Sequence, residues 1–113
     1  MADAPKTRSL ITLPAAPRKG VPFEVRALLG HPMENGLRPD GYGNVVARSL
    51  VTSFECTLDG VQVCRITLHP AIAANPYLAF WVRADGDGPG TLQFEWLGDN
   101  GFQHRETRAL QVV

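Results

Sequence analysis

The stretch SFECTLDGVQVCRITL, residues 53–68, holds two alternating apolar and polar runs on either side of an Asp-Gly pair. Alternation with a period of two is typical of a strand that buries one face. Asp59-Gly60 suits a two-residue turn, because the central positions of such a turn need positive φ angles. The stretch therefore predicts a β-hairpin.

The second strand of this hairpin changes the parity of its apolar positions. Direct pairing across the turn sets Cys56 opposite Val63, after which the apolar residues are Cys64, Ile66 and Leu68. Such a change indicates a β-bulge or a crossing between sheets. In the direct register the two cysteines lie on opposite faces, so a disulfide between them would need the bulge. We interpret them as buried thiols that pack as small apolar groups.

The rest of the chain predicts more short strands. They cover residues 7–13, 23–29, 77–84, 92–96 and 102–113. The continuous apolar run 77–84 indicates a strand buried on both faces, or an edge strand under the long loop. Residues 69–76 could form one or two helical turns at most. Three aromatic residues on these strands are expected in the core: Trp81, Phe94 and Trp96.

About seven strands, with 11 glycines and 9 prolines to make turns, predict an all-β fold. The expected architecture is an immunoglobulin-like antiparallel β-sandwich. Its 113 residues suffice for a single domain, 1–113, with 1–6 expected to be flexible.

Composition argues against two classes of partner. Lys and Arg number 11, as do Asp and Glu, so the formal net charge is zero. No long-range field then favours nucleic acid or an anionic membrane. No apolar run approaches the ~20 residues that span a bilayer, and residues 1–20 lack the apolar run of a signal peptide. A weakly charged surface also suits a chain that lives bound to a protein partner.

No motif for catalysis or metal binding stands out. The histidines, His31, His69 and His104, lack the close spacing of metal ligands. His31 and His69 each precede proline, which indicates turns. A Ser/His/Asp order, a nucleophile elbow and a nucleotide-binding glycine loop are all missing from the sequence. We therefore predict no catalytic residues, no cofactor and no resident metal.

The connection 30–44 is the first place to look for function. It holds two prolines and four glycines, and it is longer than the connections that compact domains normally use. Loops of that length often carry binding residues.

Two segments carry a family resemblance. They are HPMENGLR, residues 31–38, and LHPAIAANPYL, residues 68–78. With FEC at 54–56 and GF at 101–102, they resemble the Z subunit of the SoxYZ sulfur carrier, from about Phe23 to the C-terminus. In that family SoxY carries sulfur intermediates on the cysteine of a glycine-rich C-terminal tail during thiosulfate oxidation.

The resemblance implies a non-catalytic sandwich that scaffolds SoxY in a heterodimer and meets other Sox enzymes through that complex. This chain ends ALQVV, residues 109–113, without glycine or cysteine, so it is not expected to be the carrier arm. The family also implies a periplasmic location, reached with a partner that bears the signal. Without SoxY, the neutral chain is expected to be prone to self-association.

The two segments supply the candidate partner-binding residues. These are His31, Pro32, Met33, Leu37, His69, Pro70, Asn75 and Tyr77. One alternative is a stand-alone immunoglobulin-like binding module with an exposed aromatic platform. A second alternative is a small redox or metal protein that uses both cysteines and the histidines.

Overall fold

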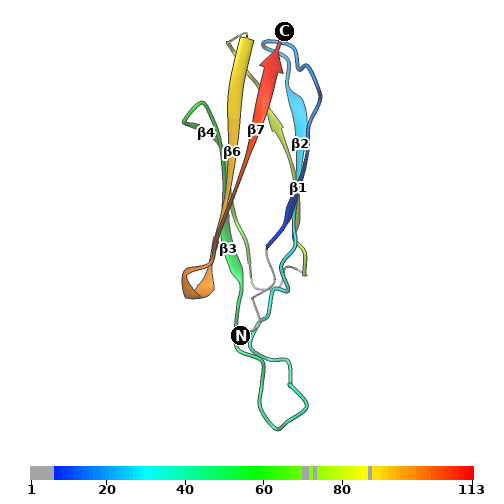
Figure 1. Cartoon of the computed structure of the whole chain (residues 1–113), viewed down its shortest axis with the longest axis vertical. Helices are drawn as coiled ribbons and strands as arrows, with labels where there is room; N and C mark the ends of the chain where they lie inside the picture. The colour runs from blue at the N-terminus through cyan, green and yellow to red at the C-terminus, as the bar shows by residue number, and fades with distance from the viewer. Residues whose placement is uncertain (1–6, 70–71, 73, 87) are drawn as a thin grey trace.

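Two antiparallel sheets packed face to face make up the protein (Figure 1). The computed structural model describes residues 7–69, 72, 74–86 and 88–113. The molecule is elongated, with principal extents of 57 × 31 × 20 Å. The long connection after the second strand projects beyond one end of the sandwich, and the C-terminus lies at the other end. The segment 1–6, expected to be flexible, lies outside the described residues.

The small sheet has the order β1-β2-β5 and the large sheet the order β4-β3-β6-β7. The strands are β1 (Ser9–Thr12), β2 (Phe23–Leu29), β3 (Val51–Leu58), β4 (Val61–Thr67), β5 (Tyr77–Val82), β6 (Gly88–Gly98) and β7 (Gln103–Val112). A 3-10 turn, η1 (Asp99–Gly101), joins β6 to β7. These seven strands confirm the predicted all-β antiparallel sandwich. In constant-type immunoglobulin domains the fourth strand joins the first sheet, whereas here β4 pairs with β3.

The central hairpin confirms the predicted turn but corrects its register. Asp59 and Gly60 both have positive φ, at 49° and 84°. Beyond them, Cys56 pairs with Cys64 and not with Val63. A register shift beside Cys56 leaves Val63 as the extra residue of a bulge, which accounts for the change of parity. The bulge therefore sets the two cysteines directly opposite each other.

Strand β5 is not buried on both faces. It forms an edge of the small sheet, and its residues alternate between exposed and covered positions. Trp81, expected in the core, points outward and is 64% exposed. The continuous apolar run therefore reflects an outer face that is itself apolar.

The predicted helical turns in 69–76 are not seen in the part of this segment that the structure describes. Of the described residues there, the Ile72 N–H donates a hydrogen bond to the His69 carbonyl at 3.0 Å. Pro70, which belongs to this segment, lies outside the described residues.

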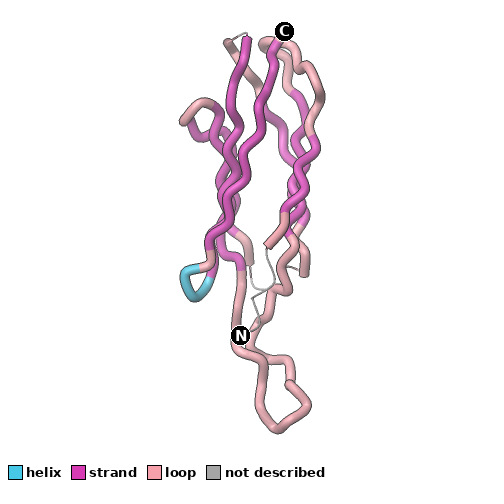
Figure 2. The backbone as a smooth tube through the Cα atoms, in the orientation of Figure 1, coloured by secondary structure: helices cyan, strands magenta, loops and turns pink. Residues whose placement is uncertain are grey.

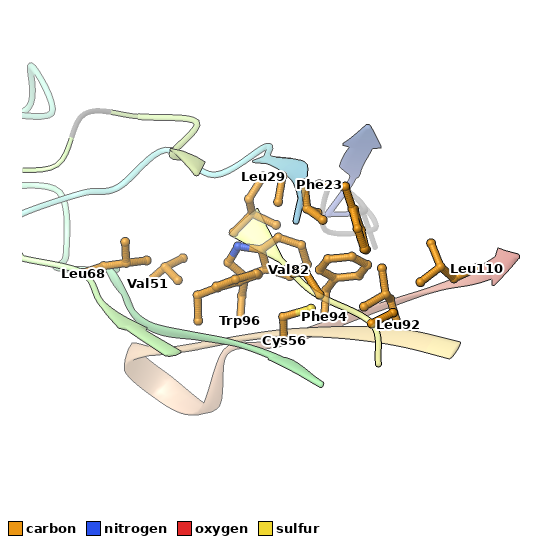
Figure 3. Close-up of a cluster of buried hydrophobic side chains, with 14 of the residues drawn as sticks. Phe23, Leu29, Val51, Cys56, Leu68, Val82, Leu92, Phe94, Trp96 and Leu110 are labelled. Carbon is orange, nitrogen blue, oxygen red and sulfur yellow. The ribbon is translucent and has the colours of Figure 1, made fainter. Parts of the chain in front are cut away.

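Apolar side chains from both sheets fill the space between the layers (Figure 3). Phe54, Phe94 and Trp96 are fully buried, and the ring centroids of Phe54 and Trp96 lie 5.1 Å apart. Each such side chain contributes about 1.5–3 kcal/mol through burial. Phe94 and Trp96 thus occupy the core positions that their strand period predicted.

Candidate partner-binding surfaces

His31 and Asn75, two predicted site residues, are hydrogen-bonded to each other across 44 positions of sequence. The His31 N–H donates to Asn75 Oδ1 at 3.0 Å, and the Asn75 N–H donates to the His31 carbonyl at 2.7 Å. Asn75 holds a φ of 55°, in the left-handed region that asparagine tolerates better than most residues. The structure thus brings together the two segments that carry the family resemblance.

The His31 ring belongs to the packed interior. Only 5% of the residue is exposed, and Nδ1 accepts a hydrogen bond from the Met33 N–H at 3.0 Å. The His31 and Phe102 rings pack edge to face, with centroids 4.8 Å apart and an interplanar angle of 71°. Burial lowers the pKa of His31, because the charged imidazolium loses hydration there. The neutral His31 ring, whose Nδ1 already accepts the Met33 hydrogen bond, therefore holds the start of the long connection in shape.

Met33 is also a core residue. It is 7% exposed, and its Sδ accepts a hydrogen bond from the Val51 N–H at 3.3 Å. The contact anchors the start of the long connection to the start of β3. Its side chain therefore offers almost no surface to a partner, and a charge introduced there would act on folding.

The remaining candidates lie at the surface. Pro32, Leu37, His69, Asn75 and Tyr77 are exposed, with Tyr77 at 56%. Pro70 is outside the described part of the chain. Of the surface candidates, Leu37 and Tyr77 carry the largest apolar side chains. They lie in different places, one on the long connection and one at the start of β5.

The long connection forms an ordered projection, here called the extension, residues 30–50 (Figure 2). Two isolated bridges hold its arms together: Glu34 with Ser49, and Pro39 with Val45. At its base the Arg48 guanidinium pairs with Asp99 at 2.9 Å, which lowers the pKa of that carboxyl.

The tip of the extension is shaped by one carboxylate. Asp40 Oδ1 accepts hydrogen bonds from the Tyr42 N–H at 2.7 Å and the Asn44 N–H at 3.3 Å. This turn presents Tyr42, which is 89% exposed, together with exposed Leu37 and Val45. An apolar tip on a hydrogen-bonded turn is suited to a protein contact, because little entropy is lost in ordering it.

A second apolar surface covers the outside of the small sheet. The register of β1, β2 and β5 sets Leu10, Leu28 and Tyr77 in one row. Trp81 lies farther along β5 on the same face, opposite Glu24. We call Leu10, Leu28, Tyr77 and Trp81 the apolar sheet face. All four residues count among the exposed large hydrophobic residues of the chain.

The outside of the large sheet is charged instead. The register of its four strands sets Arg65, Glu55, Glu95 and Arg105 in one row, here called the polar sheet face. Arg105 Nε lies 2.5 Å from Glu95 Oε2. Hydrogen bonds from Arg105 and then Gln103 lower the pKa of Glu95. Such a surface is well solvated. The outside of the small sheet carries an ion pair too, Arg26 with Glu24, between its larger apolar side chains.

The structure assembles one polar cluster that the sequence analysis missed. Ser9 Oγ donates to Glu106 Oε2 at 2.6 Å, and lies 2.9 Å from His104 Nε2. His104 Nε2 and Glu106 Oε2 are 3.8 Å apart. Hydrogen bonds from Ser9 and then Arg108 lower the pKa of Glu106. Because the serine proton is donated to the carboxylate, the histidine is not placed to take it, as a nucleophile relay would need.

The polar cluster instead ties β1 to β7 across the open edge of the sandwich. Alternation along β7 could have indicated that His104, Glu106 and Arg108 share a face. Nothing local indicates that Ser9, 95 positions from His104, meets them there.

Within the described ranges, no group of three or more His, Cys, Asp or Glu side chains is placed to hold a metal ion. A family model described as Sulphur oxidation protein SoxZ matches residues 11–109. The chain belongs to the SoxZ family.

The SoxZ match spans both segments on which the resemblance was first based, together with the extension. It leaves out only the start of the first strand, β1, and the end of the last strand, β7. It confirms the resemblance seen in the sequence. No curated protein matches this SoxZ chain closely enough to count as a relative.

Solved structures share the SoxZ fold. A superoxide reductase (neelaredoxin) from Ignicoccus hospitalis superposes with a TM-score of 0.72 at 19% identity, over 95% of this chain and 82% of that one. A putative superoxide reductase from Thermotoga maritima gives 0.69 at 13% identity, over 93% and 85%. At these identities the likeness shows the sandwich alone. As for membranes, none of the helical structure in the described ranges is long and apolar enough to cross one.

Proposed function

We propose that this chain is the non-catalytic Z subunit of a SoxYZ sulfur carrier complex. It would scaffold SoxY, whose C-terminal cysteine carries sulfur intermediates during thiosulfate oxidation. The two chains would form a heterodimer in the periplasm, reached through a signal on the partner. Other Sox enzymes would meet this chain only through the complex. Membership of the SoxZ family supports the proposal.

The observation that carries the proposal is the apolar sheet face. Tyr77 and Trp81 are 56% and 64% exposed. With aromatic side chains of ~150–250 Å², the two leave on the order of 250 Å² open to water. Leu10 and Leu28 extend the patch to a size that on soluble proteins is often functional. A stable interface covers about 800 Å² per partner, so this face would form its apolar centre.

The polar sheet face supports the same orientation. A row of two arginines and two glutamates is costly to desolvate unless every charge is paired across the interface. Docking SoxY on the small sheet leaves this row in water and covers the Arg26–Glu24 ion pair, whose two charges already pair with each other. It also keeps the extension clear at one end of the molecule.

The cysteines of the chain are poorly suited to carrying sulfur. Burial, with a smaller effect of neighbouring Cys64, raises the pKa of Cys56 to about 12. The thiolate is the species that attacks sulfur compounds, and at neutral pH Cys56 holds its proton. Burial also raises the pKa of Cys64. A supporting role beside a separate carrier cysteine agrees with this environment.

The test is co-purification from the native source with a tag on this chain. We expect a second chain with a glycine-rich, cysteine-bearing C-terminal tail to be retained in equal amount. Size-exclusion chromatography of the chain alone should show self-association that disappears when that partner is added. A chain that elutes as a monomer and retains no such partner, from cells that contain SoxY, would overturn the proposal.

The stand-alone binding module remains the second candidate. The exposed Tyr77 and Trp81 favour it, because aromatic faces also stack on sugar rings. Carbohydrate binding by the purified chain, lost on Trp81→Ala, would support this module. Retention of SoxY by the same tagged chain would support the scaffold.

A further inference from the structure

The only two cysteines of the chain are direct cross-strand partners. Cys56 on β3 is paired with Cys64 on β4 in the antiparallel register. The bulge at Val63 produces this pairing, since a regular register would set Val63 opposite Cys56. In the structure both cysteines are free thiols.

The strand geometry suits a covalent link. Residues directly opposite each other in antiparallel strands have Cα atoms about 4.5–5.5 Å apart. Disulfides need Cα separations of about 4.4–6.8 Å. Direct partners also direct their side chains to the same face. Here that face is the core, where Cys56 is buried (Figure 3) and Cys64 packs partly buried against the same cluster.

We infer that Cys56 and Cys64 form an intrachain disulfide across the β3–β4 hairpin, made by exchange with an external disulfide. Cys64 as thiolate attacks one sulfur of that external disulfide, forms a mixed disulfide and releases the first thiol. Cys56 as thiolate then attacks Cys64 Sγ, closes the internal bond and releases the second thiol. The chain loses two hydrogen atoms, and the external disulfide gains both as it is reduced to two thiols.

The order of attack follows from exposure. Cys64 lies on β4, an edge strand of the large sheet, and is only partly covered. Cys56 lies on the interior strand β3 and is fully buried, so an external disulfide reaches Cys64 first. Both thiols react slowly in the folded chain, because burial disfavours their thiolates. Exchange during folding, before the sheets close, would be faster.

The link would have one consequence that rests on the proposed function. In a complex whose partner carries sulfur on a cysteine, the partly exposed Cys64 is a slow competing acceptor when it is free. A disulfide between Cys56 and Cys64 removes even this slow reaction. It also pins the bulge and the edge strand β4 to the interior of the sheet.

The test uses the full chain and oxidised glutathione as the external disulfide. The reduced chain is unfolded in urea and refolded with the reagent, then denatured and alkylated with iodoacetamide. Intact mass should show two alkylated thiols before oxidation and none after it. A digest with a protease that cleaves before Asp59, between the two cysteines, should yield one linked species that joins the peptides of Cys56 and Cys64, and dithiothreitol should separate them.

The control variant is Cys64→Ser, a change at the partly exposed position. It should yield no linked species, and Cys56 should be found either alkylated or as a mixed disulfide with glutathione, since no second thiol of the chain can resolve that adduct. Two alkylated thiols in the oxidised wild-type chain, or a persistent glutathione adduct on Cys64, would overturn the inference. SoxY retention is scored separately, so a chain that binds SoxY and keeps two free thiols contradicts the disulfide alone.

Discussion

Asn75 and His31 hold two distant segments together through a reciprocal pair of hydrogen bonds. One bond uses the asparagine side chain, and the other uses its backbone N–H. The pair fixes where the extension leaves β2 and where the chain enters β5. The placement of Tyr77, two residues after Asn75, therefore depends on this contact.

Replacing Asn75 should separate its two roles. Asn75→Ala loses the side-chain hydrogen bond and strains a residue with positive φ, so we expect the free energy of unfolding to fall by about 1–3 kcal/mol. Asn75→Gly keeps the backbone conformation and loses only the bond, so its loss should be smaller. Urea unfolding measures both. If both variants unfold at the same free energy as the wild type, the side-chain hydrogen bond contributes nothing to stability.

His31 should make stability depend on pH between about 7 and 5. Its pKa is lowered in the folded chain, whereas in the unfolded chain it is about 6.5. The unfolded state therefore binds more protons as pH falls through about 6.5, and folding stability declines with falling pH. The stabilising contribution of neutral His31 is fully present above its unfolded pKa of about 6.5. It is lost as the pH falls from there toward the lower pKa of the folded chain.

The control for this pH dependence is His31→Gln, which does not titrate. Urea unfolding at pH 7, 6 and 5 should give a shallower slope for the variant. Glu95, Asp99 and Glu106, whose pKa values are also lowered, begin to lose their contribution near their unfolded values of about 4. That window lies below the one assigned to His31. Identical slopes for variant and wild type would contradict the assignment.

Met33 should matter for folding and not for partner contact. Met33→Ala empties a buried position, so we expect a loss of about 2–4 kcal/mol in the free energy of unfolding. Met33→Leu keeps the volume and should cost less than about 1.5 kcal/mol. The Leu variant should retain SoxY as the wild type does. Loss of SoxY by a stably folded Met33→Leu chain would show that the thioether contacts the partner.

The apolar sheet face should be the surface that SoxY covers. Tyr77→Glu and Trp81→Glu each place a charge on an exposed apolar position, so each should weaken SoxY binding at least about tenfold with little loss of stability. The matched control is Leu97→Glu. Leu97 is an exposed apolar residue of β6, in the large sheet, and does not belong to the buried set of that strand. Titration calorimetry with purified SoxY measures all three. Equal weakening by Leu97→Glu would remove the small sheet as the specific site.

The sequence predicted the strands because alternation with period two is local information. It predicted the Asp59-Gly60 turn for the same reason. The pairing of Cys56 was wrong because the parity change showed that a bulge was present but not which residue it expelled. The register leaves Val63 unpaired, although its side chain still packs partly buried against the core, as do Cys64 and Ile66.

The surfaces were harder to predict than the fold. An apolar outer face and a strand buried on both sides give the same continuous apolar run, so Trp81 was expected in the core. Ser9 meets His104 and Glu106 only because β1 and β7 lie on facing sheets, which no local pattern encodes. The segments with His31 and Asn75 were singled out by resemblance, and their contact emerged from the structure.

The exposed row of Leu10, Leu28 and Tyr77 has a consequence for the cell. Newly made copies that find nothing to cover this row would be targets for chaperones and proteases. Overproduction of the chain alone should then raise its turnover, and its steady-state level should follow the abundance of whichever protein shields it.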